Sequence, residues 1–105
     1  KVRHGDRDVA IELPPLHAQG RAVVLLDDMA SSGRTLAQAT RLLRAAGAAS
    51  VDVAVTHALF AGDALQALDD AGVGEVWSTD CIPHASNAVP MAEPLAQALR
   101  SLLPA

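Results

Sequence analysis

The chain has 105 residues, enough for one domain with a real core, since half of these residues are hydrophobic. Its net charge of −4 excludes a general polyanion binder, and an aromatic content of 2% leaves no stacking surface for single-stranded nucleic acid. A single cysteine excludes an internal disulfide framework, and no apolar run reaches the ~20 residues of a membrane span. We therefore expect a cytoplasmic domain with no nucleic-acid or membrane partner.

The apolar pattern predicts an ordered series of strands and helices. Residues 1–8 are charged and predict a flexible loop, and residues 9–13 alternate as a half-covered strand does. The apolar run 22–26 predicts a strand buried on both faces. Further along the chain, the expected helices are 35–46, 63–71 and 94–103, and the expected strands are 51–56, 75–78 and 88–91. The leucines expected to face inward are Leu36, Leu42 and Leu43 in the first helix and Leu65 and Leu68 in the second.

This order of elements defines the expected fold class. Strands that alternate with helices predict an α/β fold with a mostly parallel central sheet and helices on both faces. Ligands of such sheets bind beyond the carboxyl ends of the strands. Asp27 and Asp28 follow the strand 22–26 directly, so we expect them at this edge of the sheet.

A loop of small and hydroxyl residues follows the acidic pair and leads into the first helix. It contains Ser31, Ser32, Gly33, Arg34 and Thr35. The N–H groups of such a loop converge, and the helix start adds partial positive charge, so the loop suits a phosphate. The carboxylates before it accept hydrogen bonds from hydroxyls or help to hold a divalent cation. A sugar phosphate carries both a phosphate for the loop and hydroxyls for the carboxylates.

Two familiar nucleotide motifs are absent from this stretch, and a simpler interpretation remains open. The loop contains neither GxxxxGK[ST] nor GxGxxG. It could be an ordinary strand-to-helix connection in which Ser32 or Thr35 caps the helix. Arg34 favours the phosphate interpretation, because a cation at a helix start opposes the dipole unless an anion binds there. Elsewhere, Cys81 and His84 are three residues apart, but no second pair completes a zinc site.

Several stretches together resemble one family, the ribose-phosphate pyrophosphokinases. VVLLDDMASSGRTL resembles the ribose-5-phosphate loop of phosphoribosyltransferase-like three-layer folds, and its acid-acid-Met start favours the pyrophosphokinases. VAVTHALFAGDAL, VWSTDCIPH and VPMAEPLAQALRSL resemble three further stretches of that family, and KVRHGDRD resembles its flexible catalytic loop. The resemblance covers nearly the whole chain but only the C-terminal half of such an enzyme, as a single domain over residues 1–105.

The resemblance implies an activity and a role for each matching residue. Such enzymes transfer pyrophosphate from MgATP to the C1 hydroxyl of ribose 5-phosphate, giving phosphoribosyl pyrophosphate and AMP. Asp27 and Asp28 would contact the ribose hydroxyls with Mg²⁺ nearby, and the loop residues would surround the 5-phosphate. Lys1 and Arg3 match the catalytic Lys-x-Arg pair. Many members have an aspartate where Ser31 stands.

The resemblance also implies partners. The family is usually oligomeric, so we expect a homo-oligomer. Most ATP-binding residues come from the N-terminal half, so we expect these residues alone to be inactive. Two other functions stay open: a base-salvage phosphoribosyltransferase, and a non-catalytic regulatory homologue that binds the sugar phosphate. The base-salvage enzyme would need a base-binding segment that the sequence does not show, and the Lys1 and Arg3 pair speaks against the regulatory homologue.

Overall fold

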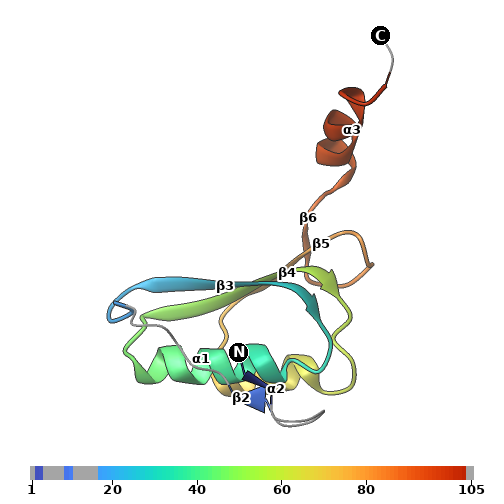
Figure 1. Cartoon of the computed structure of the whole chain (residues 1–105). Helices are drawn as coiled ribbons and strands as arrows, with labels where there is room; N and C mark the ends of the chain where they lie inside the picture. The colour runs from blue at the N-terminus through green and yellow to red at the C-terminus, as the bar shows by residue number, and fades with distance from the viewer. Residues whose placement is uncertain (1, 4–8, 11–16, 104–105) are drawn as a thin grey trace.

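The structure is a computed structural model that describes residues 2–3, 9–10 and 17–103 (Figure 1). Its elements, in chain order, are β1 (Val2–Arg3), β2 (Val9–Ala10), β3 (Ala22–Ala30), α1 (Arg34–Ala45), β4 (Ser50–Ala58), α2 (Ala64–Ala71), β5 (Val76–Thr79), β6 (Asn87–Val89) and α3 (Ala92–Arg100). The two elements β1 and β2 form a separate antiparallel pair. The predicted flexible loop 1–8 and strand 9–13 lie largely outside the described residues, so the loop's flexibility and catalytic role stay predictions.

The central sheet confirms the predicted α/β class. Its four strands lie in the order β3-β4-β5-β6 and all pair in parallel. The β3–β4 pair is the longest and runs in one register from Ala22 opposite Ser50 to Ala30 opposite Ala58. The two connections β3-α1-β4 and β4-α2-β5 each carry a helix, as crossovers between parallel strands require.

The strand β3 is longer than predicted. The apolar run suggested an end at residue 26, but pairing with β4 extends the strand to Ala30. Asp27 lies opposite Val55 and therefore sits inside the strand, before the loop begins. His57, predicted to follow its strand, is also inside β4 and lies opposite Met29. A neighbouring strand supplies backbone hydrogen bonds whatever the side chains are, so hydrophobicity alone underestimates the length of both strands.

Helices cover one face of this sheet, where the sequence predicted helices on both. Both α1 and α2 lie beneath the sheet (Figure 1). Strand order advances in one direction from β3 to β5, so two right-handed crossovers place both helices on the same side. The opposite face is open within the described part of the chain, and Leu26 on it is 80% exposed. The third helix, α3, extends away from the sheet and buries no residue among those described (Figure 1).

The core lies between the sheet and these two helices. Leu36 and Leu43 of α1, Leu68 of α2, and three valines of β4 are buried there. Each buried side chain of this size stabilises the fold by about 1.5–3 kcal/mol. Leu42 and Leu65 were predicted to face inward but are 39% and 43% exposed. Leu43 in α1 and Leu68 in α2 are fully buried, whereas Leu42 and Leu65 lie at the edges of the same helix faces. The buried face of each helix is therefore narrower than predicted.

Candidate functional site

The acidic pair lies at the carboxyl end of β3, where ligands of parallel sheets bind. The N–H of Asp28 donates to Oδ1 of Asp27 at 2.9 Å, and the N–H of Met29 donates to Oδ1 of Asp28 at 2.7 Å. These bonds fix both carboxylates against the backbone. Each carboxylate keeps acceptor capacity for a ligand hydroxyl, because it offers about four lone-pair sites.

Asp28 is poised to stay ionised. The pKa of Asp28 lies below its ordinary value, chiefly because the Met29 N–H donates to its carboxylate. A side-chain interaction with Asp27 lowers this pKa further, and His57 on the neighbouring strand adds a smaller electrostatic effect in the same direction. A permanently charged acceptor suits the recognition of hydroxyl donors or of a cation.

The loop after β3 turns sharply into α1 at Gly33. This residue is the N-cap of α1 and has φ +76°, a left-handed conformation that favours glycine. It has no side chain, so no cap hydrogen bond closes the helix start. Ser32 Oγ accepts a weak bond of 3.4 Å from the N–H of Arg34. The interpretation in which Thr35 caps the helix is therefore wrong, and the Ser32 contact is too long to serve as a strong cap.

The amide groups of this loop are available to a ligand. Within residues 17–103, no backbone or side-chain acceptor bonds the N–H groups of Ser31, Ser32 or Gly33. The first turn of α1 also contains no acidic residue. Unsatisfied N–H groups at a helix start attract an anion, since the helix dipole adds partial positive charge there.

The segment after β4 holds the loop in place. The N–H groups of Leu59 and Phe60 donate to the carbonyl of Ala30 at 3.1 and 2.9 Å, and that of Ala61 donates to the carbonyl of Ser31 at 2.8 Å. Gly33 packs so closely on α2 that a Cβ there would lie 3.3 Å from the Ala64 carbonyl oxygen. These contacts occupy the carbonyl groups of Ala30 and Ser31, while the amide groups of residues 31–33 have no acceptor within residues 17–103.

The structure therefore brings together most of the predicted site. The acidic pair and the loop residues, namely Asp27, Asp28, Ser31, Ser32, Gly33, Arg34 and Thr35, are contiguous at the end of β3 and the start of α1. Lys1 lies outside the described residues, and Arg3 is on β1, which belongs to the other sheet. The described residues contain no group of three His, Cys, Asp or Glu side chains that could hold a metal ion.

Sequence reasoning missed a polar cluster on the β5–β6 connection, which we call the His84 cluster (Ser78, His84, Ser86 and Asn87). His84 Nδ1 lies 2.8 Å from Ser86 Oγ, and Ser86 Oγ lies 2.7 Å from Ser78 Oγ. Asn87 Nδ2 donates to Ser78 Oγ at 2.9 Å and also to two carbonyl groups. The sequence signal that could have revealed this cluster is a serine within a strand (Ser78) and an asparagine at the start of the next strand (Asn87). Buried polar side chains of this kind require hydrogen-bond partners.

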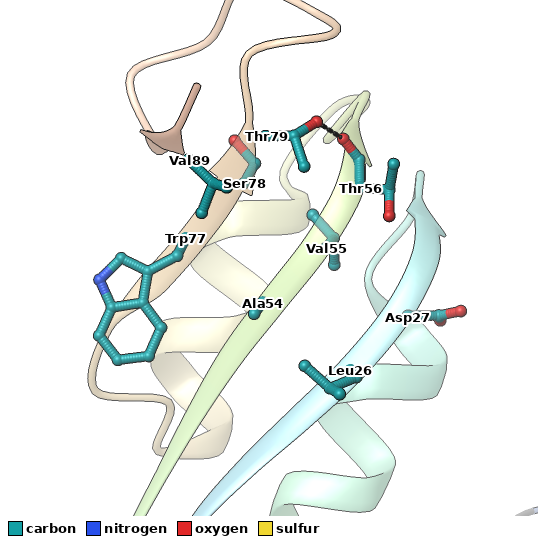
Figure 2. Close-up of a pocket in the computed structure, with 9 residues that line it drawn as sticks. All are labelled: Leu26, Asp27, Ala54, Val55, Thr56, Trp77, Ser78, Thr79 and Val89. Atoms are coloured by element: carbon teal, nitrogen blue, oxygen red, sulfur yellow. Dashed lines mark hydrogen bonds between the residues drawn. The ribbon is translucent and has the colours of Figure 1, made fainter. Parts of the chain in front are cut away.

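A groove of about 250 Å³ lies on the open face of the sheet and borders this site, since Asp27 is among its lining residues. Figure 2 shows Leu26, Trp77 and Val89 along it, with Asp27 at its edge on β3. The hydroxyl of Thr79 is already occupied, since it donates to the carbonyl of Thr56 at 2.6 Å. The groove is therefore lined mainly by apolar side chains.

This geometry defines a class of protein: a parallel α/β domain in which an acidic strand end leads through a glycine turn into the next helix. Residues 9–94 match the family model of the phosphoribosyl synthetase-associated domain. The chain belongs to this family, that of the ribose-phosphate pyrophosphokinases. Among the described elements, no helix combines the length and apolar character that crossing a bilayer requires.

Individual relatives agree with this assignment. The chain is 37% identical over 102 residues to a ribose-phosphate pyrophosphokinase of Methanopyrus kandleri, covering 97% of this chain and 35% of the relative. It is 40% identical over 99 residues to that of Halobacterium salinarum, covering 94% and 34%. A crystal structure of phosphoribosylpyrophosphate synthetase from Mycobacterium smegmatis has a TM-score of 0.71 and 33% identity, covering 84% of this chain and 32% of that one. The chain thus spans about a third of the length of these relatives.

Proposed function

We propose that this domain binds the ribose 5-phosphate of a ribose-phosphate pyrophosphokinase, which transfers pyrophosphate from ATP to the C1 hydroxyl of the sugar. One observation carries the proposal: the amide groups of Ser31, Ser32 and Gly33, which no acceptor bonds in the described part of the chain, follow closely on the carboxylates of Asp27 and Asp28. An anion subsite and a hydroxyl subsite adjoin each other, and a sugar phosphate needs both.

The phosphate subsite works mainly through the backbone. The loop N–H groups and the start of α1 would donate to the phosphate oxygens, while Arg34 and the hydroxyl of Thr35 flank them. Hydrogen bonds to charged groups contribute roughly 1.5–3 kcal/mol each. Because the carbonyl groups of Ala30 and Ser31 are already bonded to residues 59–61, the loop needs little reorganisation to receive the anion.

The hydroxyl subsite works through the acidic pair. Ionised carboxylates accept hydrogen bonds from the 2- and 3-hydroxyls of the ribose, and the lowered pKa of Asp28 keeps this acceptor charged at neutral pH. The sugar would therefore be held at both ends, with its C1 hydroxyl left free. Holding a reactant in one orientation removes much of the entropic cost of a bimolecular step.

The same carboxylates fit a magnesium ion held mostly by water and substrate oxygens. Mg²⁺ is commonly bound by one or two carboxylates together with substrate phosphates, and Asp27 and Asp28 supply two hard oxygen donors. When bound, such an ion would neutralise charge on the transferring phosphoryl groups. ATP contacts are proposed to come largely from the N-terminal half that such enzymes contain, and the catalytic Lys1 and Arg3 from the loop 1–8.

A coupled assay on the whole protein tests the reaction. Incubation with MgATP and ribose 5-phosphate is expected to release AMP and phosphoribosyl pyrophosphate in equal amounts. Asp28→Asn should lower the rate by 10²-fold or more, in the range that electrostatic groups contribute, and the exposed control Asp69→Asn should not. Release of pyrophosphate that depends on an added nucleobase would instead establish a salvage phosphoribosyltransferase. Binding of ribose 5-phosphate with no AMP release would indicate the regulatory homologue.

A further inference from the structure

The His84 cluster is linked to the loop after β3 (residues 31–35, the phosphate loop) through the side chain of Phe60. The rings of His84 and Phe60 lie with their centroids 5.0 Å apart and their planes tilted by 46°. Phe60 is one of two residues, with Leu59, whose N–H groups donate to the carbonyl of Ala30 at the entrance to the loop. The β5–β6 connection and the loop after β3 are therefore linked although α1, β4, α2 and β5 lie between them in sequence.

Phe60 needs support at this position. Its φ is +42°, a left-handed backbone conformation that a bulky residue seldom adopts. Such conformations persist only where surrounding contacts hold them. The buried ring packs in the core cluster that includes Ala30, Leu36 and Ala64, and the His84 ring covers it from the β5–β6 side. Loss of that cover would free the segment 59–61, whose N–H groups hold the loop.

The orientation of the His84 ring is itself fixed. Its Nδ1 accepts the backbone N–H of Ser86 at 3.0 Å and lies 2.8 Å from the Ser86 hydroxyl. Because Nδ1 accepts the Ser86 N–H, it carries no proton. The Ser86 hydroxyl therefore donates to Nδ1, and Ser86 Oγ in turn accepts the hydroxyl proton of Ser78. The hydrogen bonds of the His84 cluster thus form one chain of donors that runs from Asn87 through Ser78 and Ser86 to the imidazole of His84.

We propose that His84 is a positioning residue for the phosphate loop, acting through Phe60 and held by Ser78, Ser86 and Asn87. The inference rests on the proposed function for its effect on the sugar phosphate, but its structural part is independent of any ligand. His84 makes no contact with substrate in this scheme; it restrains the segment that presents the loop's amide groups.

Amide hydrogen exchange in the whole protein tests the structural part. In His84→Ala, exchange at Phe60 and Ala61 is expected to speed up about tenfold, as local opening becomes easier. The N–H of Val53, which donates to the Glu75 carbonyl in the core, should change less than about twofold. Ser86→Ala should show the same local pattern more weakly, and His17→Ala, an exposed histidine at the other end of β3, should show none.

Ribose 5-phosphate binding, measured by calorimetry on the same variants, tests the functional part. The dissociation constant is expected to rise roughly fivefold in His84→Ala, the size of coupling seen for residues remote from a ligand. The proposal is overturned if exchange at Phe60 and Ala61 stays unchanged, or rises only in step with Val53. If the wild type binds no ribose 5-phosphate, the proposed function fails, and the exchange data alone still decide the positioning role.

Discussion

The backbone N–H of Asp28 donates a hydrogen bond of 2.9 Å to Oδ1 of Asp27. Two adjacent carboxylates would repel each other if both were free in solution, but here each accepts the N–H of the following residue. The pair is therefore held in a set arrangement near the end of β3 without any ligand. This preorganisation is the main physical reason to place hydroxyl recognition at these two residues.

The lowered pKa of Asp28 leads to a prediction about acid stability. Because the folded-state pKa lies below the unfolded value of about 3.9, the carboxylate stabilises the fold above that pH. This contribution should disappear as the pH falls through the folded-state pKa. We expect NMR titration to place the Asp28 midpoint below 3.9. The free energy of unfolding should also depend less steeply on acid pH in Asp28→Asn.

The control is Asp69→Asn, which removes an exposed carboxylate of α2. An Asp28 midpoint at or above the ordinary value, or an acid dependence equally reduced in both variants, would contradict the assigned role of the Met29 hydrogen bond.

Gly33 offers a sharper test, because the chain contains a matched control. In Gly33→Ala the alanine would have to adopt a φ of +76°, and its Cβ would lie 3.3 Å from the backbone oxygen of Ala64. In Gly20→Ala the alanine would have to adopt a similar φ of +74°, but its Cβ would meet no described atom within 4 Å. We expect chemical denaturation to show a loss of about 1–2 kcal/mol for Gly20 and more for Gly33. Equal losses would mean that the packing on Ala64 does not constrain the loop.

Arg44 should stabilise the contact between the two covering helices. Its Nη2 donates to the Gly72 carbonyl at 2.8 Å, just beyond the end of α2, and its Nη1 donates to Ala49 O at 3.3 Å. We expect Arg44→Met to lower the free energy of unfolding by about 1–2 kcal/mol, since carbonyl groups at a helix end lose their donor. Arg41→Met, an exposed position on the same helix, should change it by less than about 0.5 kcal/mol. Comparable losses in both variants would contradict this role.

The open face of the sheet should tolerate a charged substitution at a strand position that is normally apolar. Leu26 is 80% exposed although it lies in the middle of a strand. We expect Leu26→Lys to change the free energy of unfolding by less than about 0.5 kcal/mol. Leu68→Ala on the covered face should cost about 2–5 kcal/mol. A large loss for Leu26→Lys in the whole protein would show that polypeptide covers this face there.

Much of the fold could be predicted because its signals are local. The apolar run 22–26, the glycine at position 33 and the leucine spacing of α1 each specify their element without reference to distant residues. The uncovered face could not be predicted, because it depends on the direction in which successive strands are added to the sheet.

The candidate site also contains residues that local sequence predicts and residues that it does not. Asp27, Asp28 and the loop are contiguous in sequence, so a pattern could find them. The link from His84 to Phe60 joins two connections that meet only in the folded chain. Residues that support a site through tertiary contacts leave little trace in local spacing.

The most direct test of the account is a map of amide chemical shifts while ribose 5-phosphate is added to the protein. We expect the largest changes on residues 31–35 and smaller changes on Asp28 and Met29. Ribose without its phosphate should leave residues 31–35 almost unaffected. Largest changes along the Trp77 groove, or a loop whose amide signals do not move at saturating sugar phosphate, would contradict it.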